Sequence, residues 1–199
     1  MIIMARYAAE HKGETRQRIL EAADDLMKVR GFESASVGDV MARAGLTVGG
    51  FYAHFPSKDA LAREALLFGL SRSVDRLLGS LAAIDDPKAR VRALIRQYLA
   101  QADDPDLEHA CPMTLALPDL ARADREARNA FAMHTGALLD RIAERFPEIE
   151  GMTRREAALF VYTSCAGAVS VARAVASPDA RQRILGTTER MLVRALRLV

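Results

Sequence analysis

The sequence predicts an all-α protein, and three observations lead to this fold class. Half of the 199 residues are hydrophobic and 27% are charged, while Ala, Leu, Arg and Glu abound and β-branched or aromatic runs are scarce. Apolar residues recur at spacings of three and four along most of the chain, as on the buried stripe of a helix. Glycines and Asp-Pro or Ser-Pro pairs separate these stretches, as they do at helix ends. We therefore expect about nine helices and no strand.

The first four expected helices are closely spaced. In the first, apolar residues from Ile19 to Met27 form one stripe, and Gly31 follows as a C-terminal cap. Serine or threonine stands at the start of the next three, as N-caps do. The third is very short because the residue before Pro56 avoids the helical region. These helices are predicted at residues 15–30, 36–44, 47–55 and 57–80.

Five longer helices are predicted in the rest of the chain. Asp86 and Ser177 are N-caps followed directly by proline, which favours the first helical position. Thr153 and Glu156 have the spacing of a capping box. The helix that they open is apolar on most sides, so it needs neighbours on more than one face. These helices are predicted at residues 86–102, 112–121, 124–146, 153–176 and 177–196.

The charge and the cysteines set limits on the class of protein. A net charge of +2 permits a nucleic-acid partner without requiring one. Cys111 and Cys165 have neither metal-ligand spacing nor the density of a disulfide scaffold, which fits a reducing cytoplasm. The first residues are too poor in apolar side chains for a signal peptide, and no charge-free apolar stretch is long enough to span a bilayer. We expect a cytoplasmic protein with no membrane partner, metal ion or cofactor.

The informative stretch is residues 36–59, which read SVGDVMARAGLTVGGFYAHFPSKD. Two short capped helices meet there at residues 44–47, and a tight glycine turn joins the two helices of a helix-turn-helix unit. The second helix of such a unit enters the major groove of DNA by its N-terminal end. Thr47 there offers a hydroxyl, the following glycines let the backbone approach DNA, and Tyr52, His54 and Lys58 can bond to phosphate oxygens. We therefore predict a three-helix DNA-binding domain at residues 12–56.

This stretch resembles the TetR family of regulators, whose DNA-binding helices typically read Asp-Ile-Ala-x-x-Ala-Gly-Val-Ser-x-Gly-x-x-Tyr-x-His-Phe-x-x-Lys. The resemblance extends over about residues 15–66. Three residues depart from the pattern: Met41 replaces a small alanine, Val48 a polar residue, and Gly50 a threonine or alanine. These departures suggest base reading through apolar contact, such as Val48 on a thymine methyl group, and through close backbone approach. The matching residues are Asp39, Val40, Ala44, Gly45, Leu46, Thr47, Gly49, Tyr52, His54, Phe55 and Lys58.

Some of these residues also have a purely structural interpretation. Tyr52 and Phe55 could both be core residues, the glycine pair could be no more than a weak helix, and Arg16 and Arg18 could be solvated surface. The candidate DNA-binding residues are Arg16, Ser36, Thr47, Val48, Gly49, Gly50, Tyr52, His54 and Lys58.

The resemblance implies that residues 57–199 form a helical ligand-binding and dimerisation domain. In the family, the last two helices of each subunit pack as a four-helix interface; packing within one chain is the alternative here. The small residues Ala166, Gly167, Ala168 and Ser170 would allow close helix approach. The resemblance implies a homodimeric repressor released from a palindromic operator by a small-molecule effector. The candidate ligand-binding residues are Tyr98, Met113, Leu117, His134 and Tyr162.

Other classes of protein account less well for this sequence than a DNA-binding regulator does. Cys111, beside Pro112 at a helix start, could sense redox state or electrophiles. An enzyme would have to combine His109, Cys111 and His134 as nucleophile and base, but no orienting carboxylate or oxyanion motif accompanies them. A purely structural helical protein leaves the glycine-rich chemistry of the third helix unexplained. We expect no enzymatic activity and no catalytic residue.

Overall fold

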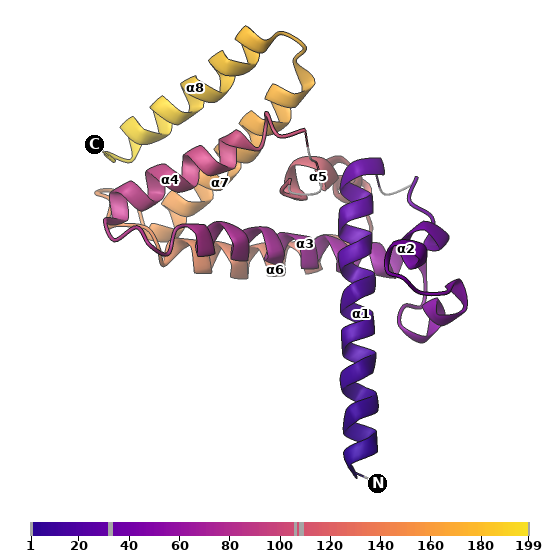
Figure 1. The fold of residues 1–199 in the computed structure, drawn as a ribbon. Helices are drawn as coiled ribbons and strands as arrows, with labels where there is room; N and C mark the ends of the chain where they lie inside the picture. Colours follow the sequence, from indigo (N-terminus) through magenta and orange to yellow (C-terminus); the bar gives the residue numbers. More distant parts are fainter. Residues whose placement is uncertain (1, 32–33, 106, 108–109, 199) are drawn as a thin grey trace. The chain divides into compact units, whose positions relative to one another are not determined.

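A computed structural model of the chain describes residues 2–31, 34–105, 107 and 110–198 (Figure 1). These residues form eight α-helices and one 3₁₀ helix, and the only β-type pairing among them is an isolated bridge between Ile149 and Met152. The all-α fold class is confirmed. The elements are α1 Ile2–Arg30, α2 Val37–Arg43, η1 Val48–Ala53, α3 Lys58–Ser80, α4 Pro87–Ala100, α5 Met113–Arg122, α6 Arg125–Ala143, α7 Arg154–Ala174 and α8 Pro178–Ala195.

Most helix ends lie where the capping residues predict them. Ser36 and Thr153 each form a capping box, and Asp86, Asp124 and Ser177 accept hydrogen bonds from the first turns of their helices. Because these contacts involve neighbours in sequence only, they can be inferred without tertiary structure.

Two expectations about helix starts are wrong. The first helix begins at Ile2 and not near Thr15. Residues 2–14 contain Ala, Arg, Glu and Lys and no proline, so the helix continues beyond its apolar stripe. Thr47 occupies the N-cap position of η1, but its side chain makes no capping hydrogen bond.

The chain divides into two compact units, Met1–Gly69 and Leu70–Val199. The division falls inside α3, so one continuous helix contributes to both units. Leu61 and Ala65 of α3 pack in the core of the first unit. The domain boundary that we predicted, between residues 56 and 57, precedes this helix and stays a prediction.

The core of the first unit is built around α1, α2 and η1. Phe51 and Phe55 are fully buried there, and their rings stack with centroids 6.0 Å apart. An ion pair lies in the same unit: Lys28 Nζ is 2.7 Å from Asp24 Oδ2, with both side chains almost fully buried. Phe55 is therefore a core residue, as one of the two interpretations held.

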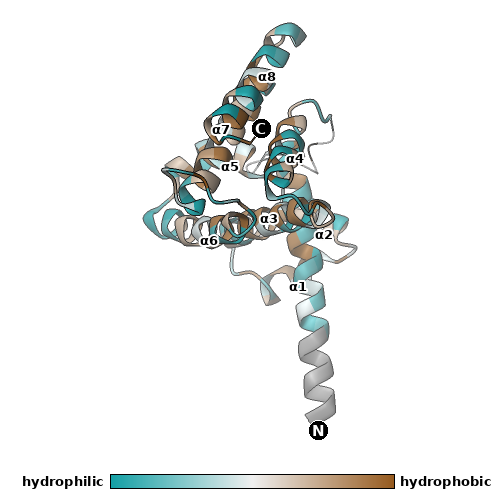
Figure 2. Ribbon diagram, turned by 90° about the vertical axis from the view of Figure 1, so that its left-hand side faces the viewer, coloured by the Kyte–Doolittle hydropathy of each residue, from teal (hydrophilic) through white to brown (hydrophobic). Residues whose placement is uncertain are grey.

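In the second unit, α7 contacts α4, α5, α6 and α8. The part of α3 in this unit lies along α6, where Ser71 Oγ is 3.0 Å from His134 Nε2 and Asp75 pairs with Arg141. Hydrophilic and hydrophobic residues alternate along α8, as expected of an amphipathic helix (Figure 2). Of the helices in the described residues, α7 alone has the length and composition to cross a membrane, and half of its most apolar window is buried, as in the core helix of a folded domain.

Candidate functional site

The turn between α2 and η1 is fixed by a C-terminal cap. Gly45 has φ +68°, its N–H donates to the Ala42 carbonyl at 3.0 Å, and the Leu46 N–H donates to the Met41 carbonyl at 2.8 Å. This pair of bonds is the Schellman arrangement, which favours glycine in the left-handed position. Arg18 Nη2 also donates to the Ala44 carbonyl at 2.6 Å. Arg18 therefore ties α1 to the turn, a role that neither sequence interpretation of this residue included.

The helix after the turn presents an exposed surface. Tyr52 is 73% exposed and Val48 51%, whereas Phe51 on the other side is buried. The Thr47 hydroxyl is not used as a cap. The exposed residues of this surface are Thr47, Val48, Gly49, Gly50 and Tyr52. Five of the nine candidate DNA-binding residues thus come together on one short element.

The fold does not account for the two glycines of η1. A Cβ atom at Gly49 would meet no described atom within 4 Å, and one at Gly50 would meet only the Met41 methyl group at 3.9 Å. Neither residue has a positive φ, in contrast to Gly45. Glycine is unfavourable in a helix relative to alanine, so its presence twice at an exposed position suggests that another molecule approaches the backbone there.

Basic residues lie in the same unit. Arg16 pairs with Glu64 of α3, and its guanidinium carbon lies 4.6 Å from the centre of the Phe55 ring. His54 Nδ1 is buried without a hydrogen-bond partner among the described residues. Desolvation, followed by the charges of Lys12 and Arg16, lowers the pKa of His54 below its ordinary value. His54 is therefore neutral at pH 7 in the free protein.

Ser36 and Lys58, the two remaining candidates, lie at helix starts. The Ser36 hydroxyl accepts from Asp39 N and donates to Asp39 Oδ2 at 2.6 Å, so the capping box already uses it. Lys58 is the first residue of α3 and is half-buried. DNA contacts by both residues stay predictions.

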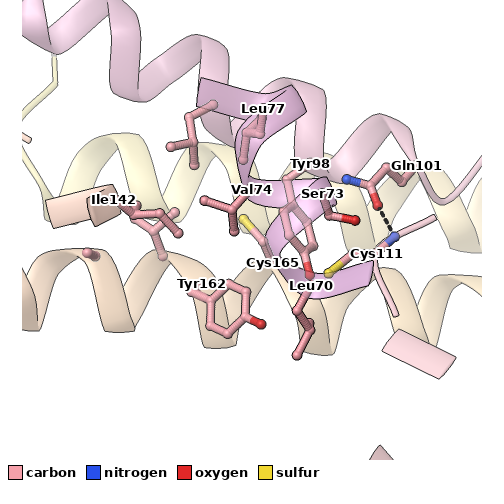
Figure 3. A pocket seen from close by; sticks show the side chains of 13 residues that line it. Leu70, Ser73, Val74, Leu77, Tyr98, Gln101, Cys111, Ile142, Tyr162 and Cys165 are labelled. Atoms are coloured by element: carbon pink, nitrogen blue, oxygen red, sulfur yellow. Dashed lines mark hydrogen bonds between the residues drawn. The ribbon is translucent and has the colours of Figure 1, made fainter. Parts of the chain in front are cut away.

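A pocket lies inside the second unit, lined by α3, α4, α6, α7 and the segment before α5 (Figure 3). Tyr98 and Tyr162 face it, with ring centroids 6.2 Å apart in an edge-to-face arrangement. Its cavity volume is about 30 Å³. The lining residues are Leu70, Ser73, Val74, Leu77, Leu94, Tyr98, Gln101, Cys111, Ile142, Ala158, Val161, Tyr162 and Cys165.

Two of the five candidate ligand-binding residues, Tyr98 and Tyr162, line this pocket. Met113 is buried and His134 is bonded to Ser71, but neither is part of the lining. Leu117 is 40% exposed, so its expected place on an inward stripe is wrong. Helical periodicity alone left its face undetermined, because Leu117 is next to Pro118 in a short, locally irregular helix.

Burial keeps the acidic groups of the pocket protonated. Desolvation raises the pKa of Tyr98 well above its ordinary value and raises that of Tyr162. It also raises the pKa of the Cys165 thiol to about 12. Cys165 is therefore a neutral thiol at physiological pH and not an activated nucleophile.

Outward-facing residues of α7 and α8 form an apolar surface. Leu159, Phe160 and Val171 of α7 are 42%, 40% and 53% exposed, and Met191 of α8 is 56% exposed. Gly167 is exposed on the same helix, which gives a neighbouring helix room to approach. Ala166 and Ala168, which we expected at a helix–helix contact with a partner, are buried within the chain. Their faces are decided by packing against other helices of the second unit.

The amino-terminal region has known relatives. A model of the family described as "Bacterial regulatory proteins, tetR family" matches residues 19–65. YfiR of Bacillus subtilis, an uncharacterised HTH-type transcriptional regulator, is 35% identical over 68 residues, which are 34% of this chain and 33% of YfiR. The HTH-type transcriptional regulator TtgR of Pseudomonas putida is 35% identical over 96 residues, which are 47% of this chain and 45% of TtgR. Residues 19–65 therefore match the TetR family. The aligned region spans between about a third and a half of the length of these two relatives.

The TetR-family fold extends over nearly the whole chain. A crystal structure of a TetR transcriptional regulator from Chloroflexus aurantiacus matches it with a TM-score of 0.71, at 23% identity, covering 94% of this chain and 96% of that one. At this level of identity the likeness shows the fold alone. The family resemblance inferred from residues 36–59 is therefore confirmed, and so is the architecture.

The sequence did not predict several features of the second unit. Ser73 and Cys165 line the pocket although neither was a candidate; Ser73 follows Leu70 by one turn on an otherwise apolar stripe of α3, which is the signal that could have found it. For the enzyme alternative, His109 lies outside the described residues, and His134 bonds to Ser71. The relatives named above are regulators.

Proposed function

We propose that this TetR-family protein is a ligand-responsive transcription regulator of the cytoplasm. In this proposal its first unit binds a palindromic DNA operator, and the protein acts as a repressor that leaves the operator when a small molecule binds the second unit. The observation that carries the DNA-binding part is the exposed surface of η1, where two glycines that the fold does not need stand beside Val48 and Tyr52.

The chemistry of η1 supports insertion into the major groove. A helix without side chains at two successive positions brings its backbone N–H groups close to DNA, and the Val48 side chain can contact a thymine methyl group. Tyr52 and Lys58 supply groups that bond to phosphate oxygens and set the position of the helix. The buried Phe51 and Phe55 hold η1 against the core, so the exposed side chains are presented from a fixed base.

The dimer is proposed to form through α7 and α8. Their exposed apolar residues, Leu159, Phe160, Val171 and Met191, have no cover within the described part of the chain. Exposed apolar side chains gathered on two neighbouring helices are typical of protein–protein contacts. A two-fold dimer would present two copies of η1, which fits a palindromic operator with half-sites about 34–36 Å apart.

Release from DNA is proposed to pass along α3. This helix begins at Lys58 in the first unit and supplies Leu70, Ser73, Val74 and Leu77 to the pocket of the second. A ligand that widens the pocket would displace these four side chains of α3. A continuous helix carries such a displacement along its axis. If the ligand favours a spacing of the two η1 helices that does not fit DNA, DNA and ligand weaken each other by the same factor, typically about 1–3 kcal/mol.

Fluorescence anisotropy with DNA from upstream of the protein's own gene tests the DNA-binding part. We expect binding that is saturable, stronger than binding to a scrambled sequence, and weakened at least about tenfold by Tyr52→Ala. Met133→Ala, which removes an equally exposed side chain from α6, is the matched control and should bind as the parent does. Equal affinity for the specific and scrambled DNA at the same salt concentration would contradict the proposal for this site.

Sedimentation tests the dimer separately. Val171→Glu should give monomers because it places a charge on the exposed α7 surface, whereas Met133→Glu should stay dimeric. Ala168 is unsuitable for this test because it is buried within the chain, where glutamate would damage the fold itself. If Val171→Glu remains a dimer, the interface lies elsewhere.

A further inference from the structure

The described lining of the pocket in the second unit is mainly apolar and contains no charged side chain. Its thirteen described lining residues include no Asp, Glu, Lys, Arg or His. Burying an unpaired ionic group in such surroundings is strongly unfavourable, so the lining selects against a charged ligand. Two aromatic rings, Tyr98 and Tyr162, provide flat apolar surface along one part of the wall.

Two hydroxyl groups of this lining have no hydrogen bond to a nitrogen or oxygen atom of the described residues. Tyr98 Oη and Ser73 Oγ are both buried and have no nitrogen or oxygen partner among the described residues. The Tyr98 hydroxyl faces the Cys111 thiol, which is only a weak hydrogen-bond donor and acceptor (Figure 3). Buried polar groups in native proteins are rarely left in this state, so each such group calls for an explanation.

A ligand with an acceptor atom would explain both groups. Burial raises the pKa of Tyr98, so its hydroxyl keeps its proton and can donate a hydrogen bond. A serine hydroxyl can also donate, and a carbonyl oxygen has two lone pairs. The Gln101 side chain also lies at the pocket: its Oε1 accepts from the Cys111 N–H at 2.8 Å, which leaves its Nε2 group as a further donor.

We propose that the effector is an uncharged, mainly apolar small molecule, such as an aromatic ketone, whose single acceptor oxygen binds the hydroxyls of Tyr98 and Ser73. This inference rests on the proposed function, in which the second unit binds an effector, and it names the chemical class of that effector. Discrimination comes from the buried hydroxyls, because an analogue without the acceptor leaves them unpaired.

The cavity is smaller than the proposed ligand, so it must widen when the ligand binds. A volume of about 30 Å³ has room for about two water molecules, whereas ligand pockets usually measure about 300–1,000 Å³. Side chains of the wall must therefore move outward when the ligand enters. Apolar side chains of the wall, such as Leu70 and Leu77 of α3, can change rotamer without breaking a hydrogen bond.

The rival ligand class is an organic acid. Arg173 lies close to the polar end of the pocket, and burial lowers the pKa of its guanidinium. However, it does not belong to the lining, and its guanidinium donates to the Gln101 carbonyl at 2.6 Å and to Thr114 Oγ1 at 3.2 Å. These bonds use two of its five N–H donors, and the guanidinium lies outside the lining that a ligand would contact.

Three probes of nearly the same shape separate the possibilities: 2-acetylnaphthalene has an acceptor, 2-ethylnaphthalene has none, and 2-naphthoate is charged. Equilibrium dialysis against the full chain without DNA should give an affinity about fivefold higher for the ketone than for the hydrocarbon, as one hydrogen bond provides. The carboxylate should bind at least about tenfold more weakly than the ketone. Tightest binding of 2-naphthoate, or no binding of any probe up to its solubility limit, would overturn the proposal.

Two variants test the role of the hydroxyls. Tyr98→Phe leaves the Ser73 hydroxyl in place and should therefore reduce the preference for the ketone, while keeping the affinity for 2-ethylnaphthalene, which reports that the pocket is intact. Thr135→Val is the matched control: the Thr135 hydroxyl is also buried without a partner but does not line the pocket, so the preference should remain. If Tyr98→Phe destabilises the chain, Ser73→Ala provides the same test with a smaller change. An undiminished preference in both pocket variants would refute the assignment.

The two proposals fail in different ways. If the ketone binds with the predicted preference but does not change operator affinity, the proposed ligand class is supported and ligand-controlled release is contradicted. If the chain instead binds its operator but none of the three probes, that result would agree with DNA binding and would contradict the proposed ligand class.

Discussion

The two glycines at and after the α2–η1 turn are predicted to respond in opposite ways to alanine. Gly45 has φ +68°, and a Cβ atom there would meet Arg18 Nη2 at 3.2 Å. An L-residue in this backbone region costs about 1 kcal/mol. Displacing Arg18 from the Ala44 carbonyl removes a charge-assisted hydrogen bond of about 1.5 kcal/mol. Alanine lowers the entropy of the unfolded chain, which returns about 0.5 kcal/mol. Gly45→Ala should therefore reduce the free energy of unfolding by about 2 kcal/mol.

Gly49→Ala is the matched substitution on the exposed side of η1. The added methyl group meets open space and the backbone has no positive φ, so the free energy of unfolding should stay the same or rise by up to about 1 kcal/mol. If η1 enters the major groove, the same methyl group holds its backbone away from the DNA, and operator affinity should fall at least about tenfold.

Urea denaturation followed by circular dichroism measures the first effect, and fluorescence anisotropy at fixed salt measures the second. With a typical m-value of about 1–3 kcal/mol per molar urea, Gly45→Ala should lower the midpoint by about 1 M. A Gly45→Ala protein as stable as the parent would refute the argument from the turn. A Gly49→Ala protein that binds the operator as the parent does would refute the reasoning that assigns this glycine to DNA approach.

Three further predictions concern charged and titratable groups. Lys58→Ala should reduce the slope of log affinity against log salt by about 1.8, as expected for one phosphate contact in each protomer of the dimer, while Lys88→Ala in the second unit leaves the slope unchanged. The lowered pKa of His54 contributes stability that is present above pH 6.5 and lost as the pH falls through the folded-state pKa; His54→Gln should therefore flatten the decline in urea midpoint between pH 7 and 5. Asp24→Asn removes the carboxylate 2.7 Å from the buried Lys28 ammonium and should cost about 3 kcal/mol in the free energy of unfolding, whereas a cost below about 1 kcal/mol would mean that other neighbours compensate.

The sequence by itself determined the helices and the motif. Caps such as Thr153 with Glu156, and glycine stops such as Gly45, act through bonds between residues a few positions apart, so their effect can be recognised without the fold. The same locality explains why the η1 surface could be predicted. Because α2 and η1 are short and closely spaced, few choices remain for which of their side chains face outward.

Only the tertiary structure decided which residues meet across the chain. It assigned Phe55 to the core and Tyr52 to the surface, tied Arg18 to the turn, and separated the buried Ala168 from the exposed Val171 on one helix. It also brought Ser73 of α3 and Cys165 of α7 to the same pocket as Tyr98. A helix that is apolar on most sides gives no periodic signal for its faces, because several arrangements of neighbours bury it about equally well. The choice among them depends on the packing of all the helices of the second unit together.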